Sequence, residues 1–184
     1  MFIDDDSDMK IAGREVCCDN MSDKDSDLFF KQKENGNIKK AKDFGAILAD
    51  IIFASDDLIE VEHNKKGIND ITEQRRILFA FTALEGMKMF TPNSITSRAA
   101  LAEFYNTLST RSPKLYEDIS SSVSFSFYYL CTRKGNMQRD GIGKTFAMLC
   151  GHEDDSIYEE LGDIFYLEFL KTIENEANKQ AFVF

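Results

Sequence analysis

Residues 133–145 hold the side chains that are best suited to binding an anion. This segment contains four basic residues and a threonine: Arg133, Lys134, Arg139, Lys144 and Thr145. They stand next to the start of a predicted helix, where the free backbone amides and the helix dipole favour negative charge. Two interpretations stay open: a site for an anion or an acidic partner, and a solvated basic loop between two helices.

The end of this segment, Gly141-Ile142-Gly143-Lys144-Thr145, has the last residues of a phosphate-binding loop. In that motif glycines let the backbone approach the phosphates, lysine supplies charge and threonine can bind Mg²⁺. The motif requires another glycine five residues before Gly143, where this chain has Gln138. The loop should also follow a strand of a parallel sheet, and no such sheet is predicted. We therefore do not predict a nucleoside triphosphatase.

Two carboxylates, Glu160 and Asp163, are three residues apart and share one face of a predicted helix. The pair resembles the Glu-x-x-Asp half of the Mg²⁺ site in all-helical MazG-type nucleotide pyrophosphatases. The other half of that site, a Glu-Glu-x-x-Glu cluster, is missing, because Asp140 is the only acid between Asp118 and Glu153. Acids in the first turns of a helix also simply complement its dipole. We predict no metal site and treat these two residues as weak candidates.

Cysteine and histidine are scarce in this chain. His152 lies two residues after Cys150, but structural zinc requires four ligands at defined spacings. Cys150 also belongs to an apolar face, where a thiol is usually unreactive. The four cysteines (17, 18, 131 and 150) include no C-x-x-C pair and form no disulfide framework. We expect free thiols, which suit the reducing cytoplasm, and no catalytic residue.

Serines alternate with apolar residues from Ser122 to Phe127. Strict alternation is typical of a strand, but Val123, Phe127 and Leu130 also follow one another at helical spacing. We predict a helix, because the chain offers no other strand for pairing. We interpret this aromatic stripe (Phe125, Phe127, Tyr128 and Tyr129) as core packing. Two alternatives remain: a pocket where small serines face large rings, and an oligomer interface if part of the stripe is exposed.

Apolar residues at three-and-four spacing predict helices through most of the remaining chain. We expect helices over 38–55, from an Asp70 cap to 90, from Pro113 to 130, over 144–150, and from a Ser156–Glu159 capping box onward, with a further helical face over 99–108. The fold class is therefore all-α: a bundle of about six helices around the 77–90 helix. Residues 1–27 form an irregular acidic N-terminal arm and residues 28–184 one helical domain.

The charge of the chain narrows the classes of function. The formal net charge is −10, and residues 1–27 hold nine of the 32 acids but three of the 22 bases. We expect neither nucleic acid nor a membrane surface as partner, because a protein that binds either one needs a local excess of Lys and Arg. No signal peptide or membrane-spanning stretch is predicted, so we expect a cytoplasmic protein.

Three functional hypotheses follow. The first is a non-enzymatic protein-interaction module without cofactor that self-associates as a homo-oligomer. The alternative is a ligand-binding helical domain, with an anion at the 133–145 loop or an apolar molecule between helices. The third is a Mg²⁺-dependent nucleotide hydrolase that uses Glu160 and Asp163.

Overall fold

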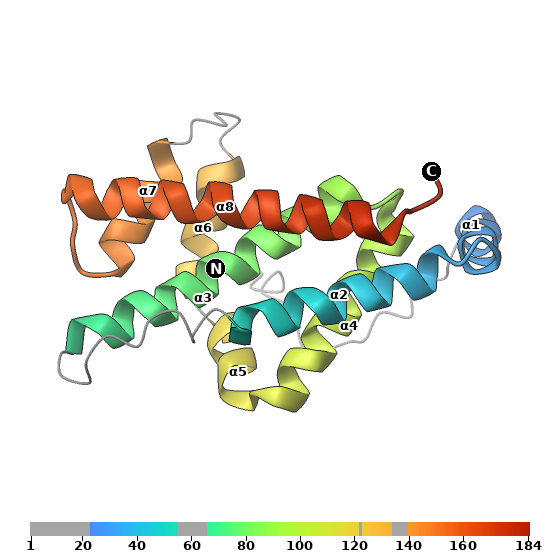
Figure 1. Cartoon of the computed structure of the whole chain (residues 1–184), viewed down its shortest axis with the longest axis horizontal. Coiled ribbons are helices and arrows are strands. Elements are labelled where there is room, and N and C mark those ends of the chain that lie inside the picture. Colours follow the sequence, from blue (N-terminus) through green and yellow to red (C-terminus); the bar gives the residue numbers. More distant parts are fainter. Residues whose placement is uncertain (1–22, 55–65, 122, 134–139) are drawn as a thin grey trace, which may run out of the picture.

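The computed structural model describes residues 23–54, 66–121, 123–133 and 140–184 (Figure 1). These residues form helices and no strands, which confirms the all-α prediction. The helices are α1 (Asp23–Glu34), α2 (Asn37–Ala54), α3 (Lys66–Phe90), α4 (Ser94–Arg111), α5 (Pro113–Ser121), α6 (Val123–Arg133), α7 (Asp140–Leu149) and α8 (Ser156–Gln180).

The predicted number of about six helices is too low, since the described residues form eight. The last residues assigned to the acidic arm, 23–27, belong to α1, and residues 1–22 lie outside the described part. The single helix predicted from Pro113 to Leu130 is two helices, with Ser122 between them outside the described residues. The helix prediction for 123–131 itself is confirmed.

Several helix ends differ from those predicted. Helix α3 begins at Lys66, so Asp70 lies inside it and is not its cap. Helix α7 begins at Asp140, so two glycines assigned to a loop lie in its first turn. The N-cap of α8 is Asp155 and not Ser156. The Asp155 carboxylate accepts a hydrogen bond from the backbone amide of Ile157. Gly151, with φ of 74°, is in the left-handed conformation after α7, as expected for a C-terminal glycine.

The middle of helix α3 is buried. The residues from Ile77 to Ala83, and also Met87, are each at most 3% exposed. Helix α8 crosses α3 and packs on it (Figure 1). Phe169 of α8 meets Phe79 edge-to-face, with ring centroids 5.0 Å apart. The prediction of a central helix around 77–90 agrees with this burial.

Helices α2 and α4 pack together through a glycine. A Cβ built on Gly45 of α2 would lie 2.0 Å from the carbonyl oxygen of Ala100 in α4. Only hydrogen fits between the two backbones at this point. Phe44, Leu48 and Phe104 on either side of this contact are fully buried. Residue type at position 45 therefore sets the distance between the two helices.

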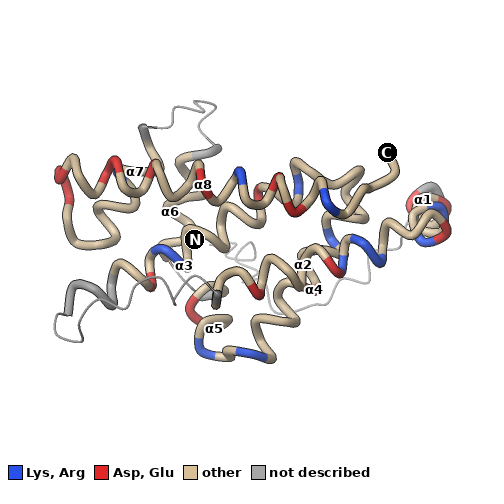
Figure 2. Tube along the Cα trace, in the orientation of Figure 1, with Lys and Arg blue, Asp and Glu red and all other residues tan. Residues whose placement is uncertain are grey.

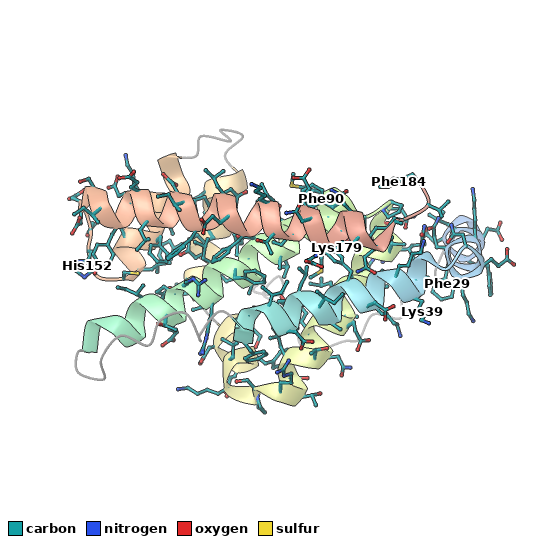
Figure 3. All side chains as sticks on the ribbon, in the orientation of Figure 1. Phe29, Lys39, Phe90, His152, Lys179 and Phe184 are labelled. Carbon is teal, nitrogen blue, oxygen red and sulfur yellow. The ribbon has the colours of Figure 1, made fainter. Side chains whose placement is uncertain are left out.

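The C-terminal residues are held against the start of α2. The side-chain amide of Asn37 donates to the carbonyl oxygen of Val183 (2.6 Å) and accepts from its backbone amide (3.0 Å). Lys40 donates to the carbonyl oxygen of Ala181 (2.6 Å), and Phe182 meets Phe44 edge-to-face. Figure 3 shows Phe184 at the same end of the molecule as Phe29 and Lys39. These contacts position the end of α8 on α2.

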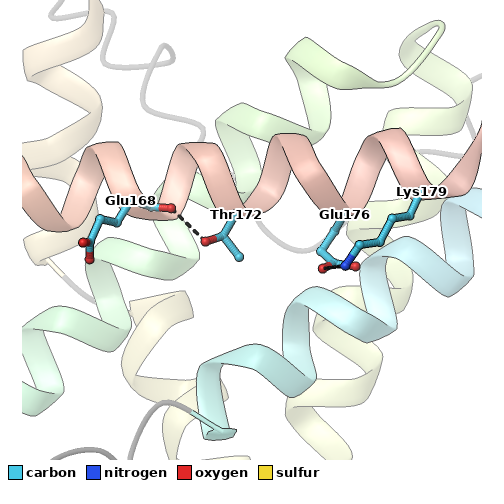
Figure 4. A network of polar contacts seen from close by, with 4 residues as sticks. All are labelled: Glu168, Thr172, Glu176 and Lys179. Atoms are coloured by element: carbon cyan, nitrogen blue, oxygen red, sulfur yellow. Dashed lines mark hydrogen bonds and ion pairs between the residues drawn. The ribbon is translucent and has the colours of Figure 1, made fainter.

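The second half of α8 presents a polar surface. Lys179 donates to the Glu176 carboxylate (2.6 Å), and the Thr172 hydroxyl donates to the Glu168 carbonyl oxygen (2.8 Å) (Figure 4). Such an exposed ion pair adds little stability. The exposed surface of α6, by contrast, is mainly apolar.

Candidate functional site

The described structure gathers only part of the predicted anion site. Lys134 and Arg139 lie outside the described residues, as does the side chain of Arg133 at the end of α6. Lys144 is exposed on α7. Thr145 is buried, and its hydroxyl donates to the carbonyl oxygen of Gly141 (2.8 Å). The Cys131 sulfur is 3.0 Å from the same hydroxyl, so Thr145 is engaged within the protein.

The first turn of α7 already has an anionic partner. The Gly143 amide donates to the carboxylate of Asp163 in α8 (2.8 Å). A carboxylate at a helix N-terminus complements the exposed amides and the dipole. A Cβ on Gly143 would lie 2.2 Å from the Glu159 carbonyl oxygen, so only glycine allows this approach of the two helices. Asp163, a weak Mg²⁺ candidate from the sequence, thus contacts α7.

Glu160, the other weak metal candidate, is exposed on α8, whereas Asp163 is half-buried. Across the described ranges, no cluster of three or more His, Cys, Asp or Glu side chains is placed to hold a metal ion. The structure therefore brings no further carboxylate to this pair within those ranges.

His152 and Cys150 lie in the turn between α7 and α8. Figure 3 labels His152 there. The His152 ring stacks on Tyr158, with centroids 3.7 Å apart and planes at 7°, and its Nδ1 is 3.8 Å from an Asp155 oxygen. Cys150 is buried. The imidazole packs on the start of α8 and thereby stabilises the turn.

Helix α6 packs one aromatic face against the core. Tyr128 is fully buried and stacks on Phe81 of α3, with ring centroids 5.5 Å apart. Phe125 meets the same Phe81 ring edge-to-face at 5.6 Å. Burial raises the pKa of the Tyr128 hydroxyl, and nearby Cys150 and Cys131 raise it further. The contacts with Phe81 thus hold the inward face of α6 against α3.

Of the aromatic residues predicted as core packing, Phe127 and Tyr129 lie on the outward face of α6, whereas Phe125 and Tyr128 pack against Phe81. Val123 is 68% exposed, Phe127 39% and Leu130 51%, and Tyr129 beside them is 47% exposed. The packing interpretation is therefore wrong for Phe127 and Tyr129 and confirmed for Phe125 and Tyr128. The physical reason is that Phe125 and Tyr128 supply a second apolar face, and that face takes the contact with Phe81.

We call Val123, Ser126, Phe127, Tyr129 and Leu130 the α6 face. Each member of this set lies three or four residues from another member, so together they cover one side of the helix. Helix α6 carries no acid and, before Arg133 at its end, no base (Figure 2). The exposed apolar residues of α8 do not form an uncharged surface, because the exposed Glu160 lies between Ile157 and Ile164 in the sequence.

A groove lies beside the α6 face, between α4, α5 and α6. Its volume is about 340 Å³, and its lining combines aromatic rings, one isoleucine and small hydroxyl side chains: Tyr105, Tyr116, Ile119, Ser120, Phe125 and Ser126. The sequence predicted a pocket where serines face large rings, and these residues include Ser120, Phe125 and Ser126 of that segment. The contribution of Tyr105 could not be foreseen, because it comes from another helix.

Comparison with known proteins adds no relationship. No protein-family model, no curated protein and no solved structure matches this chain. Within the described residues, no helix combines the length and apolar character needed to cross a bilayer. The case for function therefore depends on the α6 face and the adjacent groove.

Proposed function

We propose that this chain is a non-enzymatic interaction module that self-associates through the α6 face. The observation that supports this proposal is the row of four large, exposed apolar side chains with only Ser126 among them. Contiguous exposed apolar surface in a water-soluble helix bundle is typical of protein–protein contacts. Aromatic residues such as Phe127 and Tyr129 are also enriched where such contacts are strongest.

A second copy of the chain is the partner that the charge distribution favours. Two molecules with a net charge of −10 repel each other over most of their surfaces. The α6 face is an exception, since it brings no charged side chain to the contact. In a twofold contact the same patch meets itself, so an uncharged apolar face is complementary to its own copy. A strongly basic or acidic partner would find no matching charge there.

The proposal is tested by substituting Phe127 and Leu130 together with alanine. Burying the exposed part of each side chain contributes on the order of 1 kcal/mol. Each occurs twice in a twofold dimer, so the double variant loses about 4 kcal/mol, or roughly a thousandfold in affinity. Light scattering after size exclusion should give the wild type twice the 21.0 kDa of one chain and the variant 21.0 kDa.

The matched control removes equivalent apolar side chains from α8. The double variant Ile157→Ala and Ile164→Ala should remain dimeric, because these residues lie outside the α6 face. A monomeric wild type across the accessible concentrations would contradict the proposal. So would a Phe127/Leu130 variant that keeps the wild-type mass. Circular dichroism of each variant establishes that the helices are intact.

Ligand binding is the second candidate function, and the groove between α4, α5 and α6 favours it. A binding role at the 133–145 loop has less support, since the Gly143 amide is bonded to Asp163 and the Thr145 hydroxyl to Gly141. The hydrolase hypothesis has no supporting observation within the described residues.

A further inference from the structure

We infer that the groove between α4, α5 and α6 is a binding site for an uncharged small molecule that combines a flat ring with hydroxyl groups. This site goes beyond self-association, and its lining shares only Ser126 with the α6 face. Three different helices contribute side chains, and the groove volume of about 340 Å³ is within the range of small-molecule sites. A ring with a sugar-sized substituent fits this volume.

The lining explains the preference for an uncharged ligand. None of the side chains lining the groove carries a charge at neutral pH. A charged ligand would therefore gain no ionic partner from these side chains. Burial, and then the neighbouring Tyr116, raise the pKa of the Tyr105 hydroxyl, so this phenol stays protonated and can donate a hydrogen bond. The groove therefore offers hydrogen bonds without a net charge.

The ring preference follows from the aromatic walls. Tyr105 and Tyr116 meet edge-to-face, with centroids 6.0 Å apart, and Phe125 lines the groove from α6. A flat ring gains from offset or edge contacts with such side chains. The Ser120 hydroxyl donates to the carbonyl oxygen of Tyr116 (2.7 Å), which leaves its lone pairs to accept from a ligand hydroxyl. The groove lining thus combines aromatic rings with hydroxyl groups.

A matched pair of ligands tests this inference. Phenyl β-D-glucoside carries a ring and hydroxyl groups without charge, and phenyl β-D-glucuronide is the same molecule with a carboxylate. In two-dimensional NMR titrations of the full chain, the glucoside should shift the amides around residues 105, 116–120 and 125–126. The glucuronide should bind at least tenfold more weakly. Tyr105→Phe should weaken glucoside binding several-fold, since it removes one donor.

Two tryptophan variants on α5 separate the groove from the rest of the surface. Ser120→Trp fills the groove and should abolish the shifts, whereas Lys114→Trp, on the same helix outside the groove, should leave them unchanged. The inference is overturned if the glucoside causes no shifts, if the glucuronide binds equally well, or if the shifts persist in Ser120→Trp.

The titration is repeated on the Phe127→Ala and Leu130→Ala double variant, whose substituted residues do not line the groove. Unchanged glucoside binding is expected there. Loss of binding in this variant would overturn the site as an independent one. Failure of self-association with intact glucoside binding would affect only the proposed function.

Discussion

Replacing Gly45 by alanine should separate α2 from α4 and destabilise the protein. The new methyl carbon would lie 2.0 Å from the Ala100 carbonyl oxygen, 2.9 Å from the Ala100 carbonyl carbon and 3.0 Å from the Phe104 nitrogen. All three atoms belong to the backbone, so no side-chain rotation relieves the overlap. The two helices must move apart by about 1 Å, and a gap of that size removes up to half of each affected van der Waals contact.

The net effect is the difference between two opposing terms. Overpacking of this kind costs about 3 kcal/mol at the upper end of its usual range. Alanine in place of glycine inside a helix returns about 1 kcal/mol through helix propensity. We therefore expect Gly45→Ala to lower the free energy of unfolding by about 2 kcal/mol. For a domain of this size that corresponds to a melting temperature lower by about 4–8 °C.

Urea denaturation followed by circular dichroism measures this loss. The control is Gly141→Ala in α7, where the new Cβ would lie 3.6 Å from the Cys131 Cβ, an ordinary contact. This control should be as stable as the wild type or up to about 1 kcal/mol more stable. If Gly45→Ala unfolds at the same urea concentration as Gly141→Ala, the close approach of α2 and α4 is refuted.

Two further substitutions probe buried polar groups. Asn37→Ala removes both hydrogen bonds to Val183, so we expect a loss of about 2 kcal/mol and faster hydrogen exchange at residues 181–184; unchanged exchange there would contradict the docking of this segment. Tyr128→Phe removes a buried hydroxyl that has no hydrogen-bonding partner in the described structure, so stability at pH 7 should be kept or raised by up to about 1 kcal/mol. Because burial raises the pKa of Tyr128 above its ordinary value of 10.0, the unfolded chain loses this proton first, and wild-type stability should fall as the pH rises above 10. Tyr128→Phe should show a smaller fall in urea titrations across this range, and an identical fall would refute the assignment to Tyr128.

Helical periodicity predicted much of the fold because most helices here have one apolar face. In α2, Phe44 and Leu48 recur at the spacing of one turn, and both are buried. Ser112-Pro113 predicted the start of α5 correctly, since proline fits the first helical position. The sequence predicts a helix start less well where two adjacent residues could each be the N-cap. Asp155 caps α8 although the adjacent Ser156 fits the capping pattern equally well.

The candidate site was less predictable because it depends on contacts between distant residues. Periodicity identifies an apolar stripe on α6 but cannot choose between two apolar faces. The structure makes that choice through Phe81 of α3, which stacks on Tyr128 and leaves Phe127 exposed. The bond between Gly143 and Asp163 spans 20 residues, and no local pattern predicts it. Residues that meet only after folding carry no signal in their own spacing.

Hydrogen exchange at two protein concentrations tests self-association through the α6 face most directly. One concentration lies below the dimer dissociation constant from light scattering, and the other lies well above it. We predict that amides of 123–133 exchange more slowly at the higher concentration, while those of α8 around Ile157 and Ile164 are unchanged. Slower exchange confined to α8, or no dependence on concentration in α6, would contradict the account.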